Sequence, residues 1–170
     1  RVIKSERKIT REELEQINPL LSQRLEGIKL KKLKEMEIAT ILNEYKTIAM
    51  IGVSRNPERT SNQIARYLIR KGFKILPVNP NYEEVEGEHC VRQLTDLCTL
   101  TSVDIVNIFR RADESADAVK QAADWKEMTG QKPVVWTQLG VSSAEGEQIA
   151  KDAGLPYVKN RCIKVEYERI

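Results

Sequence analysis

Residues 47–63 read Thr-Ile-Ala-Met-Ile-Gly-Val-Ser-Arg-Asn-Pro-Glu-Arg-Thr-Ser-Asn-Gln. An apolar run ends at Gly52, a short polar loop follows, and a helix is predicted to open at Thr60-Ser61. The backbone N–H groups of a first helical turn have no partner within the helix, and the helix dipole adds partial positive charge there. A strand, a tight turn and a helix start in this order therefore predict an anion site, and phosphate is its natural occupant.

From residue 46 onward, apolar segments alternate with amphipathic ones. The expected strands are 48–53, 73–78, 103–109, 133–136 and 155–158, and the expected helices are 63–70, 115–128 and 143–153, with a polar loop through Gly87 and a short helical segment at 94–97. Short apolar strands that alternate with helices indicate a parallel sheet with both faces covered. Right-handed crossovers then predict an α/β fold, a Rossmann-like doubly wound parallel sheet of five or six strands.

The segment before the first strand is rich in helical and charged patterns, so the expected domains are a helical extension, 1–45, and the Rossmann-like domain, 46–170. Three helices are predicted in the extension. The first begins at a capping box, 10–13, flanked by an Ile9–Leu14 staple. The second opens at Pro19 and closes at Gly27, and the third spans 30–45. The lysines at 29–34 share their helix with glutamates, which favours a solvated face over a binding patch.

Composition narrows the classes of function. The net charge of +3 and the aromatic content of 5% are too low to indicate a nucleic-acid partner. No apolar run approaches the roughly 18 residues of a membrane span, so no membrane partner is expected. Three scattered cysteines and one histidine do not form a zinc framework and make structural disulfides a poor expectation. We therefore expect a cytoplasmic protein.

Ligands of open parallel sheets lie beyond the carboxyl ends of the strands. Here Gly52 allows close backbone approach, and Arg55 and Arg59 carry charges that pair with phosphate. The hydroxyls of Ser54, Thr60 and Ser61 flank the same helix start, and either Thr60 or Ser61 is expected to cap it. Together these groups favour a phosphate site over isolated surface charges.

The loop departs from the dinucleotide fingerprint G-x-G-x-x-G, which is followed about 20 residues later by an acid for the ribose hydroxyls. Ser54 replaces the second glycine and Pro57 the third, and the second strand ends in Val78-Asn79-Pro80 without an acid. This absence suits a ribose that bears a phosphate, as in coenzyme A or NADP, and argues against NAD. The missing acid does not distinguish coenzyme A from NADP.

Several short motifs occur in order along the chain: Gly52-Val53-Ser54, Pro57-Glu58-Arg59, Val78-Asn79-Pro80, Val103-Asp104-Ile105-Val106, Phe109-Arg110, Trp136-Thr137-Gln138-Leu139-Gly140 and Asn160-Arg161-Cys162. Because of these motifs, residues 38–170 resemble the small, stand-alone CoA-binding proteins of bacteria and archaea. Those proteins are similar to the nucleotide-binding domain of the succinyl-CoA synthetase alpha subunit. The resemblance implies a domain that binds coenzyme A, with the diphosphate on the Gly52–Ser54 loop and the adenosine at the tip of the second strand. Asn81 stands where many relatives have a basic residue, and Ile163-Lys164-Val165 replaces a more common proline-containing end.

The pattern and the resemblance together give one set of expected ligand contacts: Gly52, Val53, Ser54, Arg55, Arg59, Thr60, Ser61, Val78, Asn79, Pro80, Phe109, Arg110, Gln138 and Gly140. The expected ligand is CoA or an acyl-CoA. Trp136 is a further possible contact, with the strand core as the alternative.

No set of residues indicates catalysis. His89 and Cys90 are neighbours, and adjacent side chains of an extended segment point to opposite faces, so they do not predict a catalytic pair. Cys162 is either a structural cysteine or a thiol that pairs reversibly with the coenzyme thiol. The leading hypothesis is a non-enzymatic carrier, sensor or regulatory module. The alternatives are an NADP-dependent oxidoreductase and a redox-sensing module that docks or forms a homodimer through the N-terminal helices.

Overall fold

The computed structural model describes residues 10, 12 and 19–170. The chain divides into two units between Ile41 and Leu42, and each is considered on its own. The first long element is helix α2, Pro19–Glu44, a single helix of 26 residues. The predicted break at Gly27 was wrong, because the good helix formers on both sides outweigh the ~1 kcal/mol that a glycine costs inside a helix. The predicted capping box and staple at 9–14 lie largely outside the described residues.

The unit Leu42–Ile170 alternates strands and helices along the chain. Its elements are β1 (Thr47–Ile51), α3 (Thr60–Arg70), β2 (Lys74–Val78), β3 (Glu84–Val85), β4 (Glu88–His89), the 3₁₀ turn η1 (Leu94–Asp96), β5 (Ile105–Ile108), the 3₁₀ turn η2 (Ala112–Glu114), α4 (Ser115–Thr129), β6 (Val134–Thr137), α5 (Ala144–Asp152), β7 (Tyr157–Val158) and α6 (Ile163–Glu168). Five strands form one sheet in the order β2-β1-β5-β6-β7, and every neighbouring pair is parallel. The predicted α/β class and the Rossmann-like doubly wound parallel sheet are therefore confirmed.

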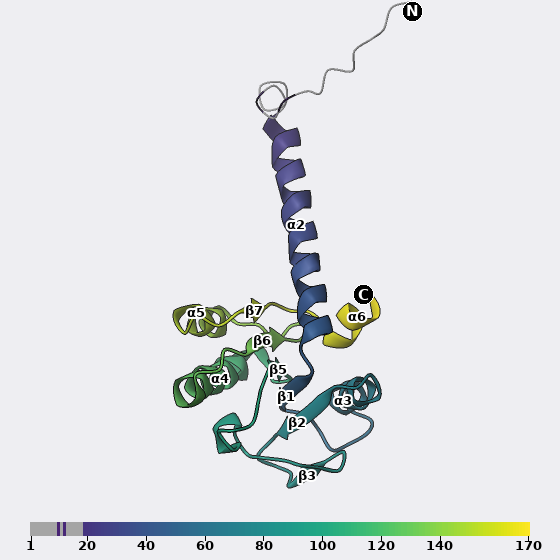
Figure 1. Ribbon diagram of the computed structural model, residues 1–170, viewed down its shortest axis with the longest axis vertical. Coiled ribbons are helices and arrows are strands. Elements are labelled where there is room, and N and C mark those ends of the chain that lie inside the picture. The colour runs from purple at the N-terminus through teal and green to yellow at the C-terminus, as the bar shows by residue number, and fades with distance from the viewer. Residues whose placement is uncertain (1–9, 11, 13–18) are drawn as a thin grey trace, which may run out of the picture. The chain divides into compact units, whose positions relative to one another are not determined.

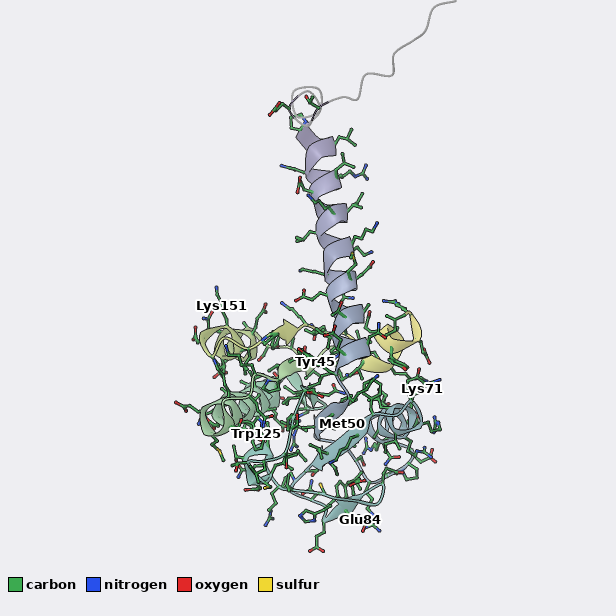
Figure 2. All side chains as sticks on the ribbon, in the orientation of Figure 1. Tyr45, Met50, Lys71, Glu84, Trp125 and Lys151 are labelled. Carbon is green, nitrogen blue, oxygen red and sulfur yellow. The ribbon has the colours of Figure 1, made fainter. Side chains whose placement is uncertain are left out.

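Helices cover both faces of this sheet. Figure 1 shows α4 and α5 on one side of the strands and α3 and α6 on the other. Alternate strand residues such as Ala49 and Ile51 join the core cluster under α4, which includes the fully buried Trp125. In Figure 2 Trp125 and Met50 lie in the interior of this unit, whereas Lys71 and Lys151 lie on its outside. The two apolar layers fix the sheet between them, and so they fix the positions of the loops at its carboxyl edge.

The strand order brings two of these loops together. Strands β1 and β5 are neighbours in the sheet, although β2 and the β3–β4 hairpin separate them in the sequence. The connection after β1 leads to β2 on one side and the connection after β5 leads to β6 on the other, which makes this the topological switch point where doubly wound sheets bind ligands. The loop after β1 begins at Gly52, whose N–H donates to the carbonyl of Val78 at 2.8 Å. The carboxyl ends of β1, β2 and β5 thus meet at one place.

The β3–β4 hairpin and helix α6 were not predicted. The expected polar loop contains the antiparallel hairpin β3–β4, whose two turn residues Glu86 and Gly87 have φ of 51° and 78°. Positive φ at both positions is typical of the tight hairpin turns that match strand twist. Glutamate is unusual at a position with positive φ, so the sequence did not predict this turn. The short C-terminal helix α6 was also missed; it is stabilised by long-range contacts, including a ring contact between Tyr167 and Phe73 at 5.3 Å between centroids.

Helix α5 offers a direct test of local stabilisation. Its N-cap is Ser143, whose Oγ accepts a hydrogen bond from the Gly146 N–H at 3.0 Å and another from Ser115 Oγ at 3.0 Å. We expect Ser143→Ala to lower the free energy of unfolding by about 1–2 kcal/mol, as loss of an N-cap does. Urea unfolding measures the change, with the exposed Ser102→Ala as the control. Equal stability of the two variants would contradict the capping role.

Candidate functional site

Gly52 lies where two loops touch. Its φ is +89°, a conformation that favours glycine, and a Cβ atom placed on it would lie 2.1 Å from the carbonyl oxygen of Phe109. No other residue type fits without moving one of the loops. The glycine therefore allows the loop after β1 to lie directly against the loop after β5.

Side chains from two segments, helix α3 and the end of β2, hold the loop that follows Gly52. The N–H of Ser54 donates to Ser61 Oγ at 2.9 Å, and Asn62 Nδ2 donates to the Ser54 carbonyl at 2.9 Å. Asn79 Nδ2 donates to the Val53 carbonyl at 3.0 Å. The loop is thus shaped before any ligand arrives, and its backbone polar groups are largely satisfied.

The start of helix α3 differs from the expectation. Its N-cap is Arg59, which is extended at φ −81° and ψ 138°, and no side chain caps the helix. The predicted capping by Thr60 or Ser61 was wrong, because both residues lie inside the helix and the Ser61 hydroxyl accepts from Ser54 instead. The first-turn N–H groups therefore lack a capping side chain and remain suited to an anion.

A cleft of about 660 Å³ opens beside this helix start. Eight of the expected contact residues line it: Gly52, Ser54, Arg59, Thr60, Ser61, Phe109, Arg110 and Gln138. The other lining residues come from the same loops and from neighbouring segments: Ile64, Tyr82, Arg111, Glu114, Leu139, Val141 and Cys162. We call this the main cleft.

Two cations of the main cleft are available for an anion. Arg59 and Arg110 make no ion pair or side-chain hydrogen bond with any of the described residues. Arg111 differs, because its guanidinium pairs with Asp113 at 3.5 Å and with Glu114 at 3.0 Å. Two unpaired guanidinium groups beside an uncapped helix start give the cleft a positive end suited to phosphate.

The remaining expected contacts lie elsewhere. Val53, Val78 and Asn79 are buried, and the Asn79 side chain is used for the loop contact described above. Pro80 lines a neighbouring cavity, and Arg55 lines a third one. Gly140 is exposed and has a φ of +72°. The structure therefore brings most of the expected residues together in the main cleft. The expected residues at the end of β2 are instead buried or line a neighbouring cavity.

A buried amide pair behind the main cleft was not anticipated. Gln138 Nε2 donates to Asn107 Oδ1 at 2.7 Å, and Asn107 is fully buried in the middle of β5. The signal in the sequence was an asparagine inside an apolar strand, which is costly unless it has a partner. Trp136, the other possible contact, is fully buried and donates through Nε1 to the Arg161 carbonyl at 2.7 Å, so it belongs to the core.

The cysteines and the histidine occupy different environments. Cys162 lines the main cleft, whereas Cys90 is buried, and burial raises the pKa of its thiol. His89 is exposed, consistent with neighbouring side chains that point to opposite faces. Within residues 10, 12 and 19–170, no cluster of His, Cys, Asp or Glu is suited to a metal ion. In the same part of the chain, no helix combines the length and the apolarity that crossing a bilayer requires.

Comparisons with known proteins agree with this architecture. A family model described as "CoA binding domain" matches residues 46–168. The uncharacterized protein YneT of Bacillus subtilis is 33% identical over 131 residues, which cover 77% of this chain and 92% of YneT. A hypothetical protein from Pyrococcus horikoshii is similar in structure, with a TM-score of 0.72, 37% identity and coverage of 79% of this chain and 90% of its own. A Thermus thermophilus structure has a TM-score of 0.71 and 35% identity, with coverage of 79% and 97%.

Proposed function

The chain belongs to the CoA-binding domain family, and on that premise we propose that it binds coenzyme A or an acyl-CoA in the main cleft. The diphosphate lies on the Gly52–Ser54 loop and the first turn of α3. The observation that carries this placement is the uncapped helix start, which shares one cleft with the unpaired guanidinium groups of Arg59 and Arg110. Backbone N–H groups and two cations match the charge of a diphosphate.

The rest of the main cleft suits the pantetheine arm. From the helix start the lining continues to Leu139, Val141 and Cys162 beyond strands β6 and β7. These groups supply apolar surface, and Gln138, whose Nε2 donates to Asn107, keeps its Oε1 for the polar groups of the arm. The arm's thiol end would then lie on the Cys162 side, where reversible pairing of the two thiols stays a prediction.

We further propose a carrier, sensor or regulatory role without turnover. The one histidine of the chain, His89, lines a different cavity from Cys162, so these two groups do not form a nucleophile–base pair. Stoichiometric binding of CoA without conversion of acetyl-CoA during prolonged incubation is the expected behaviour. Release of free CoA from acetyl-CoA at a rate that scales with protein concentration would contradict a role without turnover.

Calorimetric titration of the purified chain with CoA, acetyl-CoA, NAD and NADP tests the ligand class. We expect saturable binding of CoA or acetyl-CoA and none of NAD. Tight binding of NADP without binding of either CoA form would favour the oxidoreductase alternative and overturn the proposal.

One substitution tests the anion site directly. Arg59→Ala is expected to weaken CoA binding by about 1–3 kcal/mol, as loss of a charged hydrogen bond does, without a large change in stability. Arg70→Ala is the matched control, because Arg70 is an exposed arginine in the last turn of the same helix. If both variants bind CoA like the wild type, Arg59 does not belong to the site.

A further inference from the structure

A second cavity, of about 480 Å³, lies beyond the end of strand β2. We call it the β2-tip cavity. Pro80 and Asn81 line it from the loop after β2, and residues 89–92 line it from the end of β4 and the segment that follows. A parallel bridge between Val78 and Val91 holds these two segments side by side, and Asn79 N–H donates to the Val91 carbonyl at 2.9 Å. The cavity is thus built on the sheet rather than on a free loop.

The β2-tip cavity adjoins the main cleft. Tyr82 lines both, and its hydroxyl lies 3.4 Å from the Ser54 hydroxyl of the phosphate loop. An extended ligand with its diphosphate at Ser54 can therefore continue past the Tyr82 ring into the second cavity. A doubly wound sheet binds a long nucleotide ligand in this way, across the ends of several strands.

The lining of the β2-tip cavity suits the phosphorylated end of a nucleotide. Pro80 and Val91 supply apolar surface for a base. The guanidinium of Arg92 makes no ion pair or side-chain hydrogen bond within the described residues, so it is available to an anion. The cavity also holds two carboxylates: Asp96 Oδ2 accepts a hydrogen bond from the backbone N–H of Gln93 at 3.1 Å, and Glu83 is exposed to water.

The other neighbouring cavity is less suited to phosphate. It is lined by Arg55 together with the three carboxylates Glu83, Glu84 and Glu86. Three carboxylates surround its one cation, whereas the β2-tip cavity has two, so its field disfavours a further negative charge more strongly. Arg92 is therefore the better candidate of the two free arginines near the β2 end.

We propose that Arg92 binds the ribose 3′-phosphate of CoA in the β2-tip cavity, with the adenine against Pro80 and Val91. This inference rests on the proposed function. It gives the chain a means to distinguish CoA from dephospho-CoA, which lacks that phosphate, by a charged hydrogen bond that only the first ligand makes. Arg92 is then a specificity-determining residue, whereas Arg59 and Arg110 bind the diphosphate that both ligands share.

Titration calorimetry with CoA and dephospho-CoA, on the full chain, separates these roles. The wild type is expected to bind CoA about tenfold more tightly than dephospho-CoA. Arg92→Gln should remove this preference by weakening CoA alone. Arg55→Gln should keep it, and Arg59→Ala should weaken both ligands to a similar extent.

The possible results distinguish a failure of the Arg92 role from a failure of CoA binding itself. If wild type and Arg92→Gln show the same ratio of affinities, or if Arg92→Gln weakens both ligands equally, the role of Arg92 is overturned while CoA binding stands. If Arg55→Gln removes the preference instead, the phosphate lies in the other cavity and the inference fails. If the wild type binds neither ligand, the proposed function itself is overturned.

Discussion

Gly52→Ala is expected to destabilise the Rossmann-like unit by about 3–5 kcal/mol and to abolish CoA binding. The new Cβ would lie 2.1 Å from the Phe109 carbonyl oxygen and 2.9 Å from its carbon, which are backbone atoms of a neighbouring loop. Relief of this clash requires that the loops after β1 and β5 move apart, and these loops form the main cleft. Thermal unfolding and CoA titration measure the two effects.

The chain provides a matched control for this substitution. Gly72 has a φ of +91°, almost the same as the +89° of Gly52, but nothing lies within 4 Å of a Cβ placed on it. Gly72→Ala therefore carries the backbone strain of a positive φ without the clash, and we expect a loss of about 1–2 kcal/mol with CoA binding retained. Equal losses in the two variants would show that backbone strain, rather than the contact with Phe109, makes Gly52 necessary.

Asn79→Ala should be the next most damaging change, with a loss of about 2–4 kcal/mol in the free energy of unfolding. The Asn79 side chain donates to the Val53 carbonyl at 3.0 Å and accepts from the Asn81 N–H at 3.0 Å. Its removal leaves the buried carbonyl of Val53 without this donor, and it frees the loop after β1 from the β2 end. CoA binding should weaken as well, although Asn79 is 6% exposed and is not among the residues that line the main cleft.

Asn81→Ala is the control for this prediction. Asn81 is exposed, and its contribution to the turn comes from its backbone N–H, which alanine keeps. Chemical denaturation of both variants should show a loss for Asn79→Ala and almost none for Asn81→Ala. A stable Asn79→Ala variant with impaired binding would instead indicate a direct contact between Asn79 and the ligand.

Local patterns predicted the elements that local physics stabilises. The apolar runs around Ile48 and Val106 became strands β1 and β5, and the amphipathic segment with Trp125 became α4. The patterns failed where contacts between distant segments decide the outcome. Helix α6 packs its Tyr167 against Phe73, and the β3–β4 hairpin is tied to α3 by Glu86, whose carboxylate accepts from Asn62 Nδ2 at 2.9 Å.

The candidate site shows the same division. The glycine, the hydroxyls and Arg59 could be predicted, because a strand–turn–helix motif lies within one short segment of the sequence. Tyr82 could not be placed in the cleft, since it reaches the cleft from a segment far from residues 47–63. Cys162, the candidate partner of the coenzyme thiol, does line the cleft. The role of Asn79 also needed the structure, because its position at the end of β2 suggested a ligand contact and its hydrogen bonds serve the loop.

Residues 47–63 by themselves thus determined the order of strand, turn and helix start and predicted an anion site there, because hydrophobic periodicity and the unpaired N–H groups of a helix start are properties of a continuous segment. Only the tertiary structure decided what surrounds that site. The order β2-β1-β5 places Phe109 against Gly52, brings Arg110 and Arg59 into one cleft, and sets the β2-tip cavity with Arg92 next to the loop after β1. Strand order is fixed by the packing of whole layers of helices on a sheet, which no local pattern in the sequence records.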